Sequence, residues 1–346
     1  MTPPSSVSAS TPVPRRIRRG ARGASRRGPE LRLGWIGFHA EGVPALEALV
    51  AHRVPIAAVI TLSPPLAAKR SAAADYISVC RRFNLPLYQV ADVNDDDTVA
   101  LLESLSLDLV FVLGWSQILR PATLRTARLG MIGAHASLLP HNRGSAPINW
   151  ALIGGEAEGG NTLMWLAESV DAGEIIDQTA FPISPYDTCA TLYDRVAASN
   201  REMILRVLPM LLAGERPGRP QPATAEPVLP RRRPADGKID WTTTSDALYN
   251  FVRGLTRPYP GAFSWLDGRR WNIWQAALVP APPNPAARSG EVLGPVLSPI
   301  DASCGQLVAC GRGTLLLLEV EGEDGEVLKG RRLSDQNWTG KVWADA

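Results

Sequence analysis

The chain has 346 residues, 45% of them hydrophobic, so it is long enough for two or three domains with sizeable cores. Its formal net charge of +2 is unevenly distributed, because residues 1–29 hold seven arginines and no acid, which leaves the remainder at −5. A mildly acidic body argues against extensive binding of a nucleic-acid backbone by the folded part. The longest apolar runs fall far short of the roughly 20 residues that cross a bilayer, so no membrane association is expected.

The cysteines and histidines favour neither a disulfide framework nor a metal site. Four cysteines (Cys80, Cys189, Cys304 and Cys310) are widely separated and form no CxxC pair. The four histidines are not spaced with other ligands as zinc sites require, so no structural or catalytic metal is expected. Reduced thiols and the lack of a membrane span indicate a cytoplasmic protein.

The first two thirds of the chain predict an α/β domain. Residues 1–29, rich in Ser, Pro, Gly and Arg, are expected to form a disordered basic tail. A catalytic domain is expected at 30–212, with strands at 31–38, 56–61, 87–90 and 107–113 and helices at 42–52, 73–83 and 96–105. This alternation implies right-handed crossovers and a Rossmann-like parallel sheet. The first turn lacks GxGxxG, so no dinucleotide site is expected.

The remaining segments predict a second domain. A strand at 162–167 and a long helix at 189–212 complete the first domain. Residues 213–238 are rich in proline and form a linker or an extended arm across the surface. From 239 to 346, a helix near 245–253 and short strands at 262–266, 270–278, 290–293, 306–309 and 313–320 predict a smaller, mainly β, barrel-like domain.

One histidine and one aspartate carry the main chemical signal. His135 lies in a stretch rich in Gly and Pro, and Asp171 follows 36 residues later. The strand at 107–113 precedes them, so both should lie near the carboxyl edge of the sheet, where open α/β folds bind ligands. A histidine oriented by a carboxylate can take a proton from an attacking amine and return it to a leaving nitrogen, as acyl transfer requires. From these residues alone, a surface pair or a helix cap is the commoner explanation.

A longer pattern resembles the signature of folate-dependent formyltransferases. HASLLPHNRGSAPINWAL at 135–152 and DAGEII at 171–176 carry this resemblance, and LGWSQIL at 113–119 resembles the pterin-side loop of the family. DGKIDW at 236–241 and RPYPGAFS at 257–264 resemble the downstream region of its longer members. The family includes methionyl-tRNA formyltransferase, glycinamide ribonucleotide transformylase and amino-sugar formyltransferases. The resemblance covers about residues 31–335 and implies formyl transfer from 10-formyltetrahydrofolate to a primary amine, with an OB-like C-terminal domain.

The resemblance also implies roles for particular residues. His135 matches the catalytic histidine, and Asp171 matches the aspartate that polarises it. Arg143 and Gly144 complete the turn after the histidine. The implied folate-binding residues are Trp115, Gln117, Leu119, Ser137, Leu138, Leu139, Pro140 and Val170. Without the surrounding match, SLLP would be read simply as a tight turn ended by proline.

Gly133 departs from the family pattern. The family usually has asparagine two residues before the histidine, where the side-chain amide donates to the oxyanion. Loss of one such donor costs about 10²- to 10³-fold in rate. A charged His135, the side chain of Gln117 or Asn142, or a backbone N–H that glycine allows to approach could replace it. GGNT at 159–162 also differs from the usual TGVT, and Asn161 is expected to be a turn residue.

The expected acceptor is a small-molecule amine. The tRNA-directed members carry a basic insertion early in the first domain, whereas residues 63–72 of this chain contain only Lys69 and Arg70 as basic residues. With the acidic body, this favours an amino sugar or an amino-acid-derived amine. Initiator methionyl-tRNA is the alternative acceptor, and a non-catalytic folate-binding homologue is a third reading supported only by Gly133. The sequence does not identify the amine, the oligomeric state or the role of the basic tail.

Overall fold

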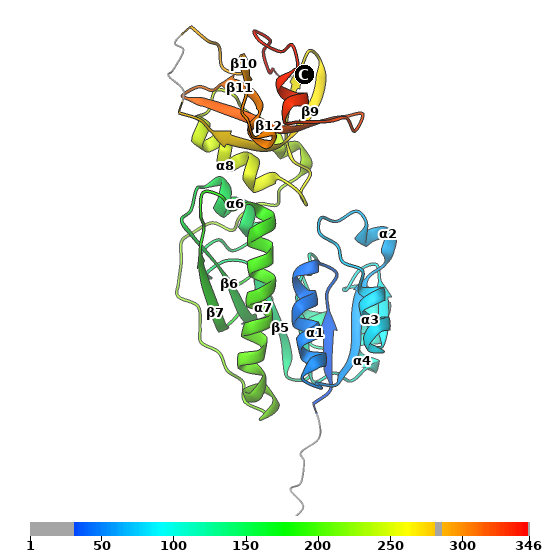
Figure 1. Cartoon of the computed structure of the whole chain (residues 1–346). Coiled ribbons are helices and arrows are strands. Elements are labelled where there is room, and N and C mark those ends of the chain that lie inside the picture. The colour runs from blue at the N-terminus through cyan, green and yellow to red at the C-terminus, as the bar shows by residue number, and fades with distance from the viewer. Residues whose placement is uncertain (1–30, 281–285, 345–346) are drawn as a thin grey trace, which may run out of the picture. The chain divides into compact units, whose positions relative to one another are not determined.

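The computed structural model describes residues 31–280 and 286–344, so the expected basic tail lies outside the described residues. Within these ranges the main strands form two sheets, coloured from blue to green and from yellow to red in Figure 1. The first sheet has the strand order β3-β2-β1-β4-β5-β6-β7. The second has the order β10-β11-β12-β9-β8, with β13 beside β12.

The first half of the first sheet confirms the predicted alternation of strands and helices. Its strands are β1 (Leu33–Ile36), β2 (Ile56–Leu62), β3 (Leu87–Val90) and β4 (Leu109–Val112). Its helices are α1 (Val43–Ala51), α3 (Tyr76–Phe83) and α4 (Asp96–Ser104), with the short η1 (Ala40–Gly42), α2 (Pro64–Ala67) and α5 (Pro121–Leu124). These strands pair in parallel, and β1 and β4 are buried throughout, as strands covered by helices on both faces should be. The strand order reverses between β1 and β4, which marks a ligand-binding switch point.

Three further strands extend this sheet, and the last two of them are antiparallel to their neighbours. They are β5 (Gly130–His135), β6 (Glu158–Trp165) and β7 (Ile175–Pro182), with α6 (Pro147–Ile153) between β5 and β6. β5 runs parallel to β4, but β6 and β7 are antiparallel to their neighbours, so the predicted parallel sheet is completed as a mixed one. The expectation that Asn161 is a turn residue is wrong. It is buried inside β6, where its amide nitrogen donates to Ser199 Oγ at 2.9 Å and to Asn200 Oδ1 at 2.7 Å.

The long helix α7 (Cys189–Leu212) is confirmed at its predicted bounds. It begins where Thr188 accepts a hydrogen bond from the backbone of Thr191, the pattern of an N-terminal cap. Its apolar residues Met203, Ile204 and Val207 are buried in the main core of the first sheet. Across the described ranges, no helix is long and apolar enough to span a membrane.

The second domain is mainly β, as predicted, and its strands pair antiparallel. Its elements are α8 (Ser245–Leu255), β8 (Ala262–Leu266), β9 (Arg269–Leu278), β10 (Val292–Val296), η3 (Asp301–Ser303), β11 (Gly305–Ala309), β12 (Thr314–Gly322), β13 (Val327–Lys329) and α9 (Arg331–Ser334). The last residues bridge the two outer strands, because Val342 pairs with Glu291 beside β10 and Ala344 pairs with Trp265 of β8. This partial closure gives the sheet its barrel-like form. Four tryptophans fill the core: Trp241, Trp271, Trp338 and Trp343.

The proline-rich segment is an ordered arm rather than a free linker. We call residues 213–233 the strap; it leads into a short turn, η2 (Pro234–Gly237). Arg219 pairs with Ile175 at the start of β7, and Leu229 pairs with Gly144. Of the two readings that the sequence left open, the extended arm is therefore the one observed.

Candidate active site

His135 is the last residue of β5, at the carboxyl edge of the sheet as expected. Its side chain is only 8% exposed, and its backbone pairs with Thr162 of β6. The ring nitrogen Nε2 lies 2.8 Å from the carbonyl oxygen of Asn142. The other nitrogen, Nδ1, lies 3.5 Å from Oδ2 of Asp171. The two residues that the sequence singled out therefore face one another.

Asp171 lies on the loop between β6 and β7, and its backbone is unusual. Its φ of +49° falls in the left-handed region, which non-glycine residues rarely adopt and which is enriched at functional sites. Its Oδ2 accepts a hydrogen bond of 2.9 Å from the backbone N–H of Gly144. The carboxylate is 20% exposed, so one side of it remains open to solvent or to a ligand.

The turn after His135 is held by a small hydrogen-bond network. Ser137 Oγ donates to the carbonyl of His141 at 2.6 Å, while Thr162 Oγ1 donates to the carbonyl of Ser137 at 2.6 Å and accepts from the N–H of Leu139 at 3.1 Å. Gln178 Nε2 donates to the carbonyl of Leu139 at 2.9 Å. The turn that presents His135 is thus rigidly tied to β6 and β7.

A cavity of about 790 Å³ opens beside this pair, within the range usual for small-molecule sites. Four of the eight predicted folate-binding residues line it: Trp115, Gln117, Leu119 and Val170. The other four, Ser137, Leu138, Leu139 and Pro140, are not part of its lining and belong to the turn described above. Gly133, His135 and Asp171 line the cavity as well. The folate-binding roles of all eight residues therefore stay predictions, four of them for residues that line the cavity and four for residues of the adjoining turn.

The structure narrows the candidates for the missing oxyanion donor. A Cβ on Gly133 would lie 2.5 Å from Cδ2 of Leu166, so this leucine occupies the direction in which an asparagine would project. Gln117 already accepts from the N–H of Val93 and donates to the carbonyl of Ala91, at 2.9 and 3.0 Å. The amide of Asn142 donates to Glu156 Oε1 at 2.9 Å. Each of these amides therefore has one N–H engaged and a second N–H left for a ligand, and both side chains are held in place by the bonds they already make.

Trp115 offers a donor that the sequence did not suggest. Its indole N–H is buried and has no hydrogen-bond partner among the described residues. The ring packs edge-on against Phe38 with 5.7 Å between centroids, and Trp115 lines the cavity that contains His135. A buried N–H without a partner costs free energy unless a ligand accepts from it.

A second pair of titratable residues lines the same cavity near the switch point. Burial lowers the pKa of His39 to about 4 and raises the pKa of Glu41 to about 7. His39 Nδ1 accepts from the backbone N–H of Glu41 at 3.3 Å and lies 3.5 Å from its Oε2. Tyr193 and Tyr259 line the same wall, and their hydroxyl groups are hydrogen bonded to each other. Sequence reasoning missed these residues because no motif joins them; only the place of His39 just after β1 could have indicated it.

The chain is similar to known proteins over most of its length. Family models described as "Formyl transferase" and "Formyl transferase, C-terminal domain" match residues 45–208 and 232–336. The methionyl-tRNA formyltransferase of Syntrophus aciditrophicus (strain SB) is 34% identical over 304 residues, which cover 84% of this chain and 93% of that protein. That of Symbiobacterium thermophilum is 38% identical over 237 residues, which cover 68% of this chain and 71% of that protein.

Solved structures share the fold at low identity. The N-formyltransferase from Helicobacter canadensis, in complex with folinic acid and dTDP-3-aminofucose, aligns with a TM-score of 0.61 and 17% identity over 83% of this chain and 98% of that one. A variant of HypX from Aquifex aeolicus aligns with a TM-score of 0.60 and 18% identity over 87% of this chain, which spans 47% of that longer protein.

The two family models cover most of the described residues, one on each domain, and the relative from Syntrophus aciditrophicus is similar to this chain across both domains. The paired His135 and Asp171 lie within the first of the two matches. The chain belongs to the formyltransferase family.

Proposed function

We propose that this enzyme transfers the formyl group of 10-formyltetrahydrofolate to a small primary amine in the cavity beside His135. The convergence of His135 and Asp171 at its wall is the observation that carries the proposal. Members of the family use a formyl-folate donor, and the relative from Helicobacter canadensis was solved with folinic acid. The donor supplies an electrophilic formyl carbon and a nitrogen leaving group.

The residues present fit a folate. One wall of the cavity is apolar, formed by Val112, Leu119, Leu166 and Val170. Trp115 also lines the cavity, and its orphaned N–H, which is shielded from solvent, becomes a donor for a pterin carbonyl or for the developing oxyanion when the indole turns toward the ligand. A mostly apolar pocket with a few placed polar groups is the usual form of such sites.

His135 acts as the proton carrier in this proposal. Its Nε2 is held by the carbonyl of Asn142 and its Nδ1 faces Asp171, so the ring is fixed on both sides. For proton transfer Nε2 must leave the carbonyl of Asn142, so that it can accept a proton from the incoming amine and release it to the leaving nitrogen, while Asp171 stays at Nδ1 and stabilises the charged imidazole between these steps. The charged ring also substitutes in part for the oxyanion donor that Gly133 lacks, together with Trp115.

The size of the cavity and the local charge support a small acceptor. The loop at 63–72 contains the short α2, and its two basic residues, Lys69 and Arg70, line the cavity instead of forming an extended basic surface. Arg231, Arg232 and Arg233 line it as well, so an amine that also bears an anionic group would be favoured. An amino sugar of the kind bound by the Helicobacter canadensis protein has this chemistry.

Initiator methionyl-tRNA is the second candidate. Both curated relatives described above are named methionyl-tRNA formyltransferases, at 34% and 38% identity. The same arginines at the cavity would then contact phosphates of the acceptor stem. A folate-binding protein without activity is a third candidate, supported by Gly133 alone.

The test is release of tetrahydrofolate from 10-formyltetrahydrofolate in the presence of charged initiator tRNA, dTDP-3-aminofucose or simple amino acids. We expect turnover with a small amine. Turnover with the tRNA alone would replace the proposed acceptor, and equal turnover by wild type and His135→Ala would rule out the proposed chemistry.

A further inference from the structure

The strap contacts the loops around His135 and Asp171 through five residues: Arg216, Arg219, Gln221, Glu226 and Leu229. Arg219 and Ile175 exchange two backbone hydrogen bonds of 2.8 and 2.9 Å where β7 begins, directly after the Asp171 loop. Ten residues further on, Leu229 accepts from the N–H of Ser145 at 3.1 Å and donates to the carbonyl of Arg143 at 2.7 Å. Between these two pairings lies Gln221, whose side chain reaches the Asp171 loop itself.

Gln221 hydrogen bonds to the backbone of the loop that carries Asp171. Its Nε2 donates to the carbonyl of Asp171 at 2.7 Å and to that of Gly173 at 2.9 Å. Two carbonyl partners require the amide nitrogen at this position, because only that end of the side chain donates. The other end, Oε1, is buried with no hydrogen-bond partner in the described ranges. Gln221 therefore contributes to this loop only as a donor.

Leu229 fixes the other partner of Asp171. The N–H of Gly144, which donates to Asp171 Oδ2, lies between the two residues that hydrogen bond to Leu229. Gly144 has a φ of +112°, and a Cβ there would lie 2.5 Å from the carbonyl oxygen of Leu229, so the close approach of the strap demands glycine. Both the backbone of Asp171 and the N–H that its carboxylate accepts from are thus located by the strap.

Most of the strap is exposed, including its contact residues Arg216, Arg219 and Glu226. Gln221 and Leu229 are partly buried, whereas their immediate neighbours Pro220, Pro222, Val228 and Pro230 are exposed. Five prolines between 217 and 230 stiffen the chain between the contact points. A stiff segment with isolated buried contacts is suited to holding loops at a fixed separation.

We propose that Gln221 is a positioning residue for formyl transfer: it holds the left-handed Asp171 in the orientation that faces His135, and the strap is a working part of the active site. This inference rests on the proposed function, because it assumes that Asp171 assists His135. The role is indirect, since Gln221 contacts the loop through backbone carbonyls and does not touch the imidazole.

The first test compares Gln221→Met, which keeps the length of the side chain and removes its donors, with Gln275→Met on an exposed position of β9 as the matched control. We expect Gln221→Met to lower kcat by about 10- to 100-fold, as small misplacements of catalytic groups do, with a KM for 10-formyltetrahydrofolate within about twofold of wild type. The acceptor is the amine of the panel above that wild type formylates fastest. A kcat within about twofold of wild type would overturn the proposal.

A second readout does not depend on turnover. Amide hydrogen exchange in peptides that cover 143–146 and 171–175 should be faster in Gln221→Met than in wild type and unchanged in Gln275→Met, because the Gly144 N–H would lose its fixed acceptor. Unchanged exchange in these peptides would contradict the proposal even if kcat fell.

Gln221→Glu gives a sharper discrimination from a general structural role. A protonated glutamic acid has one O–H donor and an ionised one has none, so the rate of this variant relative to Gln221→Met should rise as pH is lowered from about 6 to about 4, through the usual pKa of a glutamic acid. A ratio that is flat with pH would count against the positioning role. Asp171→Asn, measured beside it, separates the two hypotheses: if it is as active as wild type, the proposed function fails, and if it alone loses activity, only the role of Gln221 fails.

Discussion

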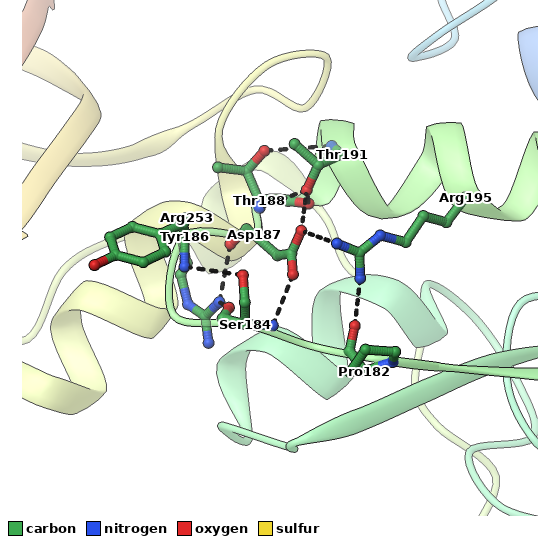
Figure 2. A network of polar contacts seen from close by, with 8 residues as sticks. All are labelled: Pro182, Ser184, Tyr186, Asp187, Thr188, Thr191, Arg195 and Arg253. Atoms are coloured by element: carbon green, nitrogen blue, oxygen red, sulfur yellow. Dashed lines mark hydrogen bonds and ion pairs between the residues drawn. The ribbon is translucent and has the colours of Figure 1, made fainter.

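Two aspartates on the loops of this enzyme have opposite surroundings. Asp187, before α7, accepts from the N–H of Ser184 at 2.7 Å, from Thr191 Oγ1 at 2.9 Å and from Arg195 at 2.8 Å, as Figure 2 shows. Asp171 accepts one backbone hydrogen bond and faces an imidazole at 3.5 Å. The exposed fractions of the two side chains are 5% and 20%.

The different surroundings indicate that Asp187 stabilises the fold, whereas Asp171 is available for chemistry. Burial works against the charge of Asp187, but the hydrogen bonds from Ser184 and Thr191 and the charge of Arg195 lower its pKa overall. Arg253 of α8 donates to the carbonyls of Ser184 and Asp187, both at 2.9 Å, so the same loop is also held by the second domain (Figure 2). A buried carboxylate that already accepts three hydrogen bonds has little capacity left for a substrate, whereas Asp171 accepts one and is more exposed.

Replacement of Asp171 should give the largest effect on activity. Asp171→Asn keeps the shape but removes the charge that stabilises a protonated His135, so we expect turnover to fall by on the order of 10²- to 10⁴-fold. The midpoint of urea unfolding should change little, because only one backbone hydrogen bond is weakened. Steady-state kinetics and urea unfolding of the same preparation check both parts. A large loss of stability would place Asp171 in the same class as Asp187.

Replacement of Asp187 should show the reverse pattern. Asp187→Ala leaves the N–H of Ser184 and the Nη2 of Arg195 without their acceptor, while Arg195 keeps the carbonyl of Pro182, and we expect the free energy of unfolding to fall by about 3 kcal/mol. Because its pKa is lowered in the folded state, its contribution is present at neutral pH and is lost as pH falls below the usual range of an aspartate. Urea unfolding at pH 7 measures the loss, with Asp194→Ala, an exposed aspartate on α7, as the control. A kcat close to that of wild type is expected.

His39 and Glu41, which also line the cavity, should make the stability of the protein depend on pH. The folded protein keeps a proton on Glu41 up to about pH 7 rather than 4.5, so its burial lowers stability as pH rises through that window. His39 stays neutral down to about pH 4 rather than 6.5, so it lowers stability as pH falls through its own window. The two effects oppose one another between pH 4.5 and 6.5.

Glu41→Gln removes one of the two opposing effects, so the stability of this variant should show the pH dependence that His39 alone produces. We expect this variant to be more stable than wild type at about pH 8 and to lose about 2–3 kcal/mol on acidification to about pH 4. His39→Gln should show the opposite slope, and Glu103→Gln, an exposed residue of α4, should follow wild type. Unfolding curves at several pH values decide; parallel pH profiles for all four proteins would show that neither group is buried as described.

The smallest effect is expected when the family residue is restored at position 133. Gly133→Asn alone should destabilise the fold by about 1–3 kcal/mol, because the new side chain meets Leu166. Gly133→Asn combined with Leu166→Ala should recover part of that loss and increase kcat if the amide reaches the oxyanion. Leu166→Ala alone is the control. Thermal unfolding and kcat of the three variants separate two effects of position 133: the lack of an amide donor, which lowers kcat, and the contact with Leu166, which limits stability.

The sequence predicted the elements more reliably than the contacts between them. Apolar runs such as 107–113 located the parallel strands, and the resemblance led directly to His135 and Asp171. The antiparallel β6 and β7 were only partly predicted, because hydrophobic period does not report strand direction. His39 and Glu41 could not be found in this way, since their pKa values arise from burial that only the folded chain creates.

The strap has a consequence for how this enzyme can be divided. Residue 212 is a natural place to cut, because the helix and the sheet that carry His135 end before it. A fragment that stops there would keep every strand of the first sheet, yet it would lack all the strap residues that pair with Ile175, Gly144 and the Asp171 loop. Modular swapping of such domains between relatives would have to carry the proline-rich stretch along with the catalytic half, even though it resembles a spacer.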